Sequence, residues 1–518
     1  MGQGRLPTGN PGILPTVPGA TGPRRGLVLS TTALILGLVV AAPGRSAGDL
    51  GSDRRFTEGY ADRTVVADGR APASRPTDFP VAGLLPDEVP IDHVIFVIKE
   101  NRTFDHYFGR YPGADGVRVG TTITGMQIPL RTAPDVILEP AIAHGFWSGL
   151  YAVDGGRMDG FNTIAGGREY DGYVQFDRGG IPNYWSYADR FVLLDRFFSS
   201  TYGPTFPEHL YTVAADSGGI MDNKAQREQQ PGHYCDDPGA FTPAFPQDLD
   251  EADLARIINL QNRIVDDSPD ALEQIAAYLE EVRACLDLPT LPAALSEAGV
   301  SWRFYSDPVF PIGDIMRAIR PIRETALWDN VVPSVSFLDD ISNGTLAQVS
   351  WVNPPAPYNE HPILPKRAMS VCAGENWTVE MMNRLQASPY WASTAVVIVW
   401  DDFGGYYDHV PPPQYDIMGL GPRVPGLVLS PYAARGGNPD GGAIDGTTYE
   451  FSSVLAFIEH VFGIPPLTER DANADPLSGA FDFGRPPDLT PYVLPLRQDC
   501  PYGRAAPFGT GDNLGTAP

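Results

Sequence analysis

The sequence predicts an α/β protein, a three-layer sandwich around a mostly parallel central sheet with one helical insertion. Short, continuous apolar runs of strand length recur along the chain, which is typical of strands covered on both faces. Helical patterns lie between and after these runs, as in sandwiches built around a parallel sheet. The 518 residues are 43 % hydrophobic and 10 % aromatic, which is enough for a large core.

The first expected strand covers 94–98 and follows a lead-in over 48–90 that is rich in Gly, Pro, Asp and Arg. Further apolar strands are expected at 395–400 and 424–429, with weaker candidates at 350–352 and 301–305. Helices are expected at 377–387 and 452–462. We therefore expect one main domain over 91–470.

Residues 221–290 differ in character and are expected to form an insertion into that domain. Within it, 250–286 is acidic and carries apolar residues at helical spacing, among them Leu254, Ile257 and Ile258. The insertion is either a cap over a functional site or a peripheral addition, and the pattern favours neither. Residues 471–518 are expected to be a Pro- and Gly-rich C-terminal tail.

The N-terminal segment 1–47 has the pattern of an export signal. It holds four arginines and no acidic residue, and the pair Arg24-Arg25 precedes an uncharged, mostly apolar run that ends in small residues. Paired arginines at this place resemble a twin-arginine signal. The alternative is an uncleaved membrane anchor, for which a run of about 17 residues is the lower limit. The sequence therefore predicts an exported protein.

The four cysteines are interpreted in the light of export. Cys235, Cys285, Cys372 and Cys500 show no C-x-x-C spacing, so a structural zinc site is not expected. In an oxidising compartment an even number of cysteines suggests two disulfides, with three connectivities open. A Cys235–Cys285 bond would close the insertion, and a Cys372–Cys500 bond would tie down the tail. The alternative is buried free thiols.

The charge balance argues against some partners. The formal net charge is -26, from 37 basic and 63 acidic residues. Phosphate contacts with nucleic acids are made mainly by Lys and Arg, so we expect no nucleic acid partner. The same charge disfavours electrostatic docking on anionic lipid, although peripheral contact with zwitterionic lipid stays open.

Two of the expected strands end in clusters of oxygen ligands. The first runs into Glu100-Asn101 and the second into Asp401-Asp402. Ligands of open α/β sheets lie beyond the carboxyl ends of the strands, and adjacent carboxylates repel unless a cation neutralises them. Glu, Asn and Asp oxygens suit a hard divalent ion, so the pattern predicts one or more Mg, Mn or Ca ions.

A hydroxyl residue and three histidines complete the candidates. Thr205 follows a Gly- and Pro-constrained turn before a helical stretch, so it could be held at a helix N-terminus, or simply cap that helix. His361 lies on a Pro-rich loop after a strand, where phosphate binding or proton donation are its expected tasks. His144 and His409 are further candidates. The remaining histidines are assigned to packing or the surface: His93, His106, His209, His233 and His460.

The stretch Glu100-Asn101-Arg102-Thr103-Phe104-Asp105-His106-Tyr107-Phe108-Gly109 resembles the opening signature of the bacterial phospholipase C and acid phosphatase family of phosphoesterases. Similar stretches follow in the same order at 156–161, 187–191, Thr205-x-Pro207, Glu360-His361-Pro362, 401–409 and Arg423-Val424-Pro425. They span about 91–465. The resemblance implies an alkaline-phosphatase-like α/β fold.

The resemblance also implies roles for single residues. Glu100, Asn101, Asp401, Asp402 and Thr205 would hold the metal. Thr205 would also attack phosphorus and form a phospho-threonine intermediate. His144, His361 and His409 would bind phosphoryl oxygens or protonate the leaving alkoxide, with Asp408 orienting His409. The metal would lower the pKa of the nucleophile and neutralise charge on the transferring group.

Some residues depart from the pattern of the phospholipases. Glu208-His209 stands after Pro207 where phospholipases usually have Asn-Arg, and Asp401-Asp402 replaces an Asp-Glu pair, whereas paired Asp occurs on the acid phosphatase side. A sulfatase is disfavoured, because its modified nucleophile needs Cys or Ser before x-Pro-x-Arg.

The leading hypothesis is an exported phospholipase C that cleaves phosphatidylcholine-like lipids to diacylglycerol and a phosphorylated headgroup. The alternatives are a broad-specificity acid phosphatase acting on small phosphoesters and a non-catalytic surface-binding relative. Aromatic loop residues could bind a choline group or belong to the core: Phe146, Trp147, Tyr184 and Trp185.

Overall fold

The structure is a computed structural model that describes residues 82–135, 141–166, 170–223, 234–266, 269–306, 313–356, 358–361, 363–364, 367–368 and 370–500. The predicted export signal, most of the lead-in and the end of the predicted tail lie outside these residues. Within the described part of the chain, no helix combines the length and the apolar character needed to cross a membrane.

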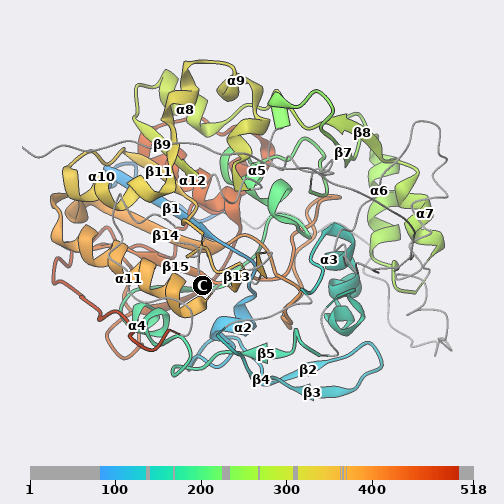
Figure 1. The fold of residues 1–518 in the computed structure, drawn as a ribbon, viewed down its shortest axis with the longest axis horizontal. Coiled ribbons are helices and arrows are strands. Elements are labelled where there is room, and N and C mark those ends of the chain that lie inside the picture. The colour runs from blue at the N-terminus through green and yellow to red at the C-terminus, as the bar shows by residue number, and fades with distance from the viewer. Residues whose placement is uncertain are drawn as a thin grey trace, which may run out of the picture. The chain divides into compact units, whose positions relative to one another are not determined.

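The central element is an eight-stranded sheet with the strand order β10-β9-β11-β1-β14-β15-β6-β16. Figure 1 labels five of its neighbouring strands, from β9 through β11, β1 and β14 to β15. Its strands are β1 (His93–Lys99), β6 (Val192–Phe197), β9 (Trp302–Ser306), β10 (Val331–Pro333), β11 (Val349–Val352), β14 (Thr394–Trp400), β15 (Gly426–Leu429) and β16 (Ala443–Tyr449). Only β15 runs antiparallel to its neighbours in this sheet. The predicted mostly parallel sheet is therefore confirmed.

The helices are α2 (Phe104–Phe108), α3 (Phe146–Val153), α4 (Pro182–Arg190), α5 (Thr205–Ala214), α6 (Glu251–Gln261), α7 (Asp270–Ala276), α8 (Leu291–Glu297), α9 (Arg320–Arg323), α10 (Phe337–Asn343), α11 (Val371–Ala387), α12 (Phe451–Phe462) and α13 (Glu469–Asn473). Short two-stranded pairs are formed by β2 (Val119–Thr121) with β3 (Gln127–Pro129), β4 (Arg131–Thr132) with β5 (Val174–Gln175), β7 (Phe241–Ala244) with β8 (Glu280–Arg283), and β12 (Ile363–Leu364) with β13 (Arg367–Ala368).

Helices cover both faces of the sheet, which explains why its central strands are continuously apolar. Trp351 of β11 lies beside Phe304 of β9 and donates its indole N–H to the Thr212 carbonyl in α5. Tyr305, the next residue of β9, points to the opposite face and packs on Phe337 of α10. Helices α5, α8 and α12 contact one another on the first face, and α4, α10 and α11 form the layer on the second (Figure 1). This is the predicted three-layer sandwich.

The structure corrects one part of the predicted helical insertion. The helical period over 250–286 holds for α6 and α7, but residues 280–283 form β8, which pairs antiparallel with β7. Only Val282 of these four residues is apolar, and its place in a strand depends on pairing with the distant segment at β7. Local periodicity carries no information on such pairing.

Both proposed disulfides are present, and together they account for all four cysteines. Cys235 is bonded to Cys285 next to the β7–β8 pair, and Cys372 of α11 is bonded to Cys500. The segment before Cys500 runs along α11, where Asn383 donates to the Leu494 carbonyl. The predicted tail is therefore docked on the fold in two places: Phe481 stacks on Phe457 of α12, and residues 492–500 lie along α11.

Candidate active site

The site is built at the carboxyl ends of β1 and β14. These parallel neighbours are in register from His93 with Thr394 to Lys99 with Trp400, so Glu100 and Asp401 leave the sheet side by side. The Asn101 backbone N–H donates to Asp401 Oδ1 at 2.8 Å, and its side-chain Nδ2 donates to Asp402 Oδ2 at 2.7 Å. The two clusters of oxygen ligands predicted at the ends of these strands are therefore hydrogen-bonded to each other.

Asn101 lies in the left-handed region at φ 57°, which few residues other than glycine adopt. Its two hydrogen bonds to the aspartates hold this conformation. Left-handed backbone at a buried polar site is a known form of stored strain at functional positions.

His209 joins this group, although the sequence analysis assigned it to packing or the surface. Its Nε2 lies 3.8 Å from Glu100 Oε1 and 3.6 Å from Asp401 Oδ2, and all three side chains are buried. His209 is four residues after Thr205 on α5, so both occupy the same face of the helix. That i, i+4 spacing is the signal in the sequence that could have identified His209.

The group fits a divalent cation. Several of its buried polar atoms lack a hydrogen-bond partner: Glu100 Oε2, Asn101 Oδ1, Asp401 Oδ2 and both ring nitrogens of His209. Buried polar atoms are almost always paired, so this concentration calls for a missing partner. Glu100, His209 and Asp401 each offer a ligand atom within 4.8 Å of the others. Carboxylate and amide oxygens with one imidazole suit Mg and Mn, and the imidazole also admits Zn or Fe.

The electrostatics agree with this fit. Burial, together with the charges of Asp401 and Asp402, raises the pKa of Glu100 well above its ordinary value. Burial raises the pKa of Asp402 to about 7, with His144 opposing the shift and Asp401 adding to it. Burial alone would also raise the pKa of Asp401, but His209 and the Asn101 N–H hold it below its usual value. A cation would relieve the mutual repulsion of these carboxylates.

Thr205 is the first residue of α5 and is buried, with 3 % of its surface exposed. The turn before it lies against the His144 segment, since a Cβ on Gly203 would come within 2.4 Å of the His144 carbonyl oxygen. The backbone N–H of Phe206 donates to Asn223 Oδ1 at 3.0 Å. Asn223, which the sequence analysis did not single out, thus reaches the N-terminus of α5.

Glu208 braces the turn from inside. Its carboxylate accepts the backbone N–H groups of Ser200 and Thr201 and the Thr201 hydroxyl. Glu208 is fully buried, and burial with the nearby charge of Asp402 raises its pKa well above its ordinary value. Its side chain is therefore occupied in holding the backbone before Thr205.

His144 and His361 lie next to each other, with ring centroids 6.4 Å apart. His144 Nδ1 lies 2.8 Å from the Ile142 carbonyl oxygen, which can only accept, so Nδ1 carries the proton and Nε2 is left for other contacts. His144 also acts electrostatically on Asp402. Two of the three predicted histidines therefore lie side by side, and the His144 segment lies against the turn before Thr205.

The third histidine belongs to a different group. His409 Nδ1 lies 2.7 Å from Asp105 Oδ2, and its Nε2 lies 3.2 Å from Asp115. Asp408, expected to orient His409, instead accepts two hydrogen bonds from Arg423. The orienting carboxylate is Asp105, because Asp408 turns inward to the buried arginine. Burial alone would lower the pKa of His409, but Asp105 raises it above its ordinary value.

The other histidines of the described chain are structural. His106 is buried between Phe176 and Tyr406, His93 lies beside Ala347 and Tyr390, and His460 lies beside the Pro86 carbonyl. His233 lies outside the described residues. Phe146, Tyr184 and Trp185 are buried, which favours the core alternative for these aromatic residues.

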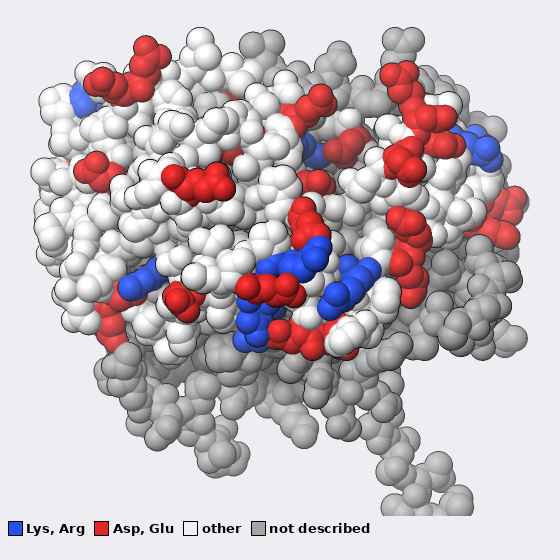
Figure 2. Space-filling model, turned by 90° about the horizontal axis from the view of Figure 1, so that it is seen from above, with Lys and Arg blue, Asp and Glu red and all other residues white. Residues whose placement is uncertain are grey.

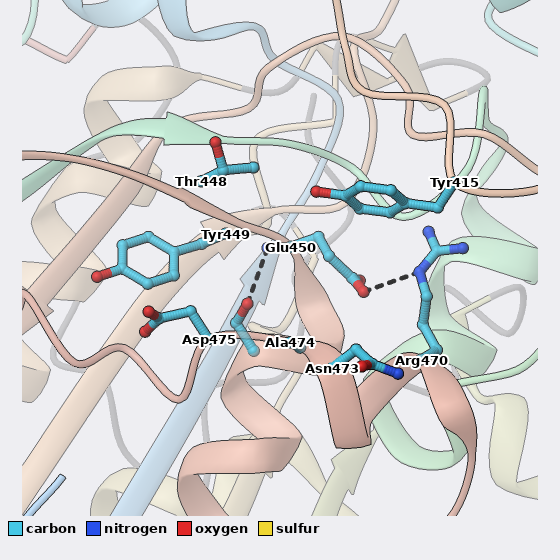
Figure 3. Close-up of a pocket in the computed structure, with 9 residues that line it drawn as sticks. Tyr415, Thr448, Tyr449, Glu450, Arg470, Asn473, Ala474 and Asp475 are labelled. Carbon is cyan, nitrogen blue, oxygen red and sulfur yellow. Dashed lines mark hydrogen bonds and ion pairs between the residues drawn. The ribbon is translucent and has the colours of Figure 1, made fainter. Parts of the chain in front are cut away.

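A small cavity lies between the end of β16, α13 and the loop at Tyr415 (Figure 3). Its volume of about 10 Å³ is at most the space of one water molecule. Arg470 lines it and donates to Glu450 Oε1 and to the Ser200 carbonyl. The cavity is part of the support of Ser200 and is too small for a phosphoester.

Charge on the surface agrees with the composition. Figure 2 shows a face on which Asp and Glu side chains are spread among uncharged ones, while most Lys and Arg side chains lie next to acidic ones. On this face the basic side chains are interspersed with acidic ones and form no broad patch.

Comparisons with known proteins agree with this chemistry. The model of the Phosphoesterase family matches residues 91–465. Phospholipase C A of Mycobacterium tuberculosis is 26 % identical over 479 residues, covering 79 % of this chain and 80 % of that protein. Non-specific phospholipase C3 of Arabidopsis thaliana is 25 % identical over 478 residues, covering 81 % and 78 %.

Among solved structures, a protein of the alkaline phosphatase superfamily from Vibrio parahaemolyticus superposes with a TM-score of 0.34 at 8 % identity, covering 83 % of this chain and 79 % of that chain. The family assignment rests on the family model, which matches well over half of the chain. The chain belongs to the Phosphoesterase family and is a phosphoric ester hydrolase.

Proposed function

We propose that the protein is an exported, metal-dependent phospholipase C that cleaves phosphatidylcholine-like lipids to diacylglycerol and a phosphorylated headgroup. The observation that carries this proposal is the buried group of Glu100, Asn101, Asp401 and His209, with its unpartnered ligand atoms beside the helix that begins at Thr205. The phospholipases C among its relatives support the choice of substrate class.

In the proposed mechanism, Glu100, Asn101, Asp401, Asp402 and His209 hold the metal, together with Thr205. A bound metal would neutralise charge on the phosphoryl group and would lower the pKa of the Thr205 hydroxyl.

Thr205 Oγ1 forms a bond to phosphorus while the bond from phosphorus to the glycerol oxygen breaks. The hydroxyl proton of Thr205 passes to solvent, and His144 or His361, in its imidazolium form, gives a proton to the departing diacylglycerol oxygen. Water then attacks the phospho-threonine, which releases the phosphorylated headgroup and restores the hydroxyl. His409 contacts Asp105 and Asp115, so proton transfer is assigned to the other two histidines.

A broad-specificity phosphatase is the second candidate, and one observation favours it. At the positions where phospholipases usually have Asn-Arg, this chain has Glu208, which braces the turn, and His209, which faces the carboxylates. Neither side chain is directed to substrate in this arrangement. A smaller set of headgroup contacts is compatible with soluble phosphomonoesters.

Export and a catalytic role have independent support. Two disulfides in one chain are typical of proteins from oxidising compartments. A non-catalytic relative would have no need of the buried ligand group, which costs free energy when it is left unpaired.

The test is product analysis with purified full-length protein on phosphatidylcholine vesicles and on p-nitrophenyl phosphate. Wild type is compared with Thr205→Ala, Asp401→Asn and the matched control Thr325→Ala, whose hydroxyl lies on the surface and bonds the Pro321 carbonyl. We expect diacylglycerol and phosphocholine from wild type and control, and losses of at least about 10³-fold in the two site variants. EDTA should abolish turnover, and Mg, Mn or Ca should restore it.

Acid-quenched wild-type protein should carry a phosphocholine adduct on the peptide that contains Thr205. Cleavage of p-nitrophenyl phosphate with intact lipid would replace the phospholipase by the phosphatase. Full activity of Thr205→Ala, or activity that EDTA does not change, would contradict the mechanism.

A further inference from the structure

The buried carboxylate of Glu360 contacts the residues that immediately precede two members of the site, and Glu360 itself precedes a third. Glu360 Oε1 accepts from Lys99 Nζ at 2.6 Å, and Oε2 accepts from Trp400 Nε1 at 3.1 Å. Lys99 precedes Glu100, Trp400 precedes Asp401, and Glu360 itself precedes His361. All three contacting side chains are fully buried.

The geometry of the sheet explains why this contact bears on the site. Lys99 and Trp400 are partners in the β1–β14 register, so their side chains share one face of the sheet. That face carries α4 and α11, since Lys99 Nζ lies 5.8 Å from the ring centroid of Trp377 in α11. The residues that follow each strand lie near His209 of α5, in the opposite layer. Glu360 thus contacts the ends of β1 and β14 on the face covered by α4 and α11, while Glu100 and Asp401 lie near His209 on the opposite face.

Two tyrosines complete the contacts of Glu360. Tyr107 donates its hydroxyl to Oε2 at 2.6 Å, and Tyr184 of α4 donates to Oε1. Four side chains from β1, α2, α4 and β14 therefore meet one carboxylate. We call Glu360 with Lys99, Tyr107, Tyr184 and Trp400 the Glu360 hub.

The hub also determines the course of the loop that carries His361. Glu360 has φ 72°, a left-handed conformation that disfavours a residue with a side chain. Lys99 Nζ donates to the Tyr358 carbonyl at 3.3 Å, and the Glu100 N–H donates to the Asn359 carbonyl at 2.9 Å. The loop is thus bonded to the end of β1 at the two residues that immediately precede Glu360.

Helix α11 leaves room for this arrangement at Gly374. A Cβ at that position would lie 2.4 Å from Glu360 Oε1, and the Gly374 carbonyl accepts from Lys99 Nζ at 3.0 Å. Glycine inside a helix is unfavourable relative to alanine. Its presence in α11 is explained by the space that the carboxylate of Glu360 needs.

Stability alone is a poor reason for such a hub. A buried ion pair can often be replaced by apolar side chains without loss, because desolvation offsets the attraction. We propose that Glu360 is a positioning residue, which holds Glu100, Asp401 and His361 in the relative geometry needed to bind the metal and the substrate. This inference rests on the metal centre of the proposed function and adds a residue that contacts neither metal nor substrate.

The first experiment measures binding of Mn²⁺ alone to metal-stripped full-length protein by calorimetry, together with urea unfolding. Glu360→Gln places an amide nitrogen against the donors of the hub and should weaken Mn²⁺ binding about 10- to 100-fold, as loss of an outer support of metal ligands does. The matched control is Glu375→Gln. Glu375 is equally buried, on α11, and accepts the N–H groups of Asn183 and Tyr184 at the start of α4. The Mn²⁺ affinity of Glu375→Gln should stay within about 3-fold of wild type, while its loss of stability should be comparable to that of Glu360→Gln.

A second pair of variants covers the case in which Glu360→Gln does not fold. Trp400→Phe keeps a buried ring and removes one donor to Glu360, and it should weaken Mn²⁺ binding about 3- to 10-fold. Its control is Trp351→Phe. Trp351 of β11 is equally buried and donates its indole N–H to the Thr212 carbonyl of α5, and removing this donor should leave Mn²⁺ affinity unchanged.

The outcomes separate the two proposals. Wild-type Mn²⁺ affinity in Trp400→Phe or Glu360→Gln, or equal losses in variants and controls, overturns the positioning role alone. A wild-type protein that binds neither Mn²⁺ nor another divalent ion overturns the metal centre and the positioning role with it. Loss of Mn²⁺ affinity in the hub variants with wild-type affinity in both controls supports the inference.

Discussion

Replacing Arg423 by Met should destabilise the protein strongly, because this arginine is the buried cation of an acidic cluster. Its side chain is fully buried, with Nε 2.9 Å from Asp408 Oδ1 and Nη2 3.2 Å from Asp408 Oδ2. Asp105, also fully buried, lies 3.6 Å from Nη2. Nη1 donates to the carbonyls of Asp115 and Asp195. Methionine fills similar space and leaves two buried carboxylates without their cation.

The magnitude follows from that environment. At an effective dielectric constant of about 20, a charge pair about 4 Å apart is worth about 4 kcal/mol, and breaking a buried pair by removing one partner costs about 3–5 kcal/mol. We therefore expect Arg423→Met to lower the free energy of unfolding by about 4 kcal/mol. Arg423→Lys keeps the charge but lacks the fork that grips Asp408, and it should lose about half as much.

The assay is equilibrium urea unfolding at pH 7, followed by tryptophan fluorescence. Arg320→Met is the matched control, since Arg320 is 47 % exposed and pairs with Asp287, which is 57 % exposed. Such surface pairs contribute less than about 1 kcal/mol. If Arg423→Met is no less stable than Arg320→Met, the buried network does not stabilise the fold and the reasoning fails.

Two further perturbations test other parts of the molecule. Burial and the neighbouring Asp471 raise the pKa of Glu459 to about 9 from an ordinary 4.5, so the native state retains a proton that the unfolded chain loses. Stability should therefore fall as the pH rises from about 4.5 to about 9, and Glu459→Gln should remove this slope and exceed wild type by on the order of 3 kcal/mol at pH 7. Parallel stability curves of the two proteins from pH 5 to 9 would contradict the assignment. Replacing Cys372 and Cys500 by Ser opens a loop of 128 residues and should cost about 2–5 kcal/mol in urea unfolding. Turnover at 25 °C should be retained, because the bond ties the C-terminal segment to the layer opposite α5. If the folded double variant loses activity, the C-terminal segment supports the site and this expectation is wrong.

The family stretches acquire separate physical roles in the structure. In Arg423-Val424-Pro425, the arginine neutralises the Asp105–Asp408 cluster. In Glu360-His361-Pro362, Glu360 is the centre of a hydrogen-bonded hub, whereas His361 lies beside His144. A motif therefore marks supporting residues and candidate reacting residues alike, and the sequence pattern does not separate them.

Local sequence patterns alone were sufficient to predict the central strands of the sheet and the ligand site at their ends. The runs at 94–98 and 395–400 predicted buried strands because only strands covered on both faces are apolar without interruption. The oxygen-rich residues that follow them predicted a shared ligand site because parallel strands end at the same edge of a sheet. The strands β6, β10 and β16 of the central sheet and the strand β8 were not predicted. The apolar run of β6 is interrupted by Asp195 and Arg196, and the existence of the other three depends on pairing with distant segments.

The sequence by itself determined the α/β class, the strand tips with Glu100, Asn101, Asp401 and Asp402, and the turn that presents Thr205, because each depends on neighbours along the chain. Only the tertiary structure decided that His209 faces the carboxylates, that Asp105 rather than Asp408 contacts His409, and that Glu360 joins Lys99 to Trp400. Those contacts span up to 304 positions of sequence. The contacts of a side chain with residues so far away in the sequence depend on how the layers pack. The residues next to it in the sequence do not determine them.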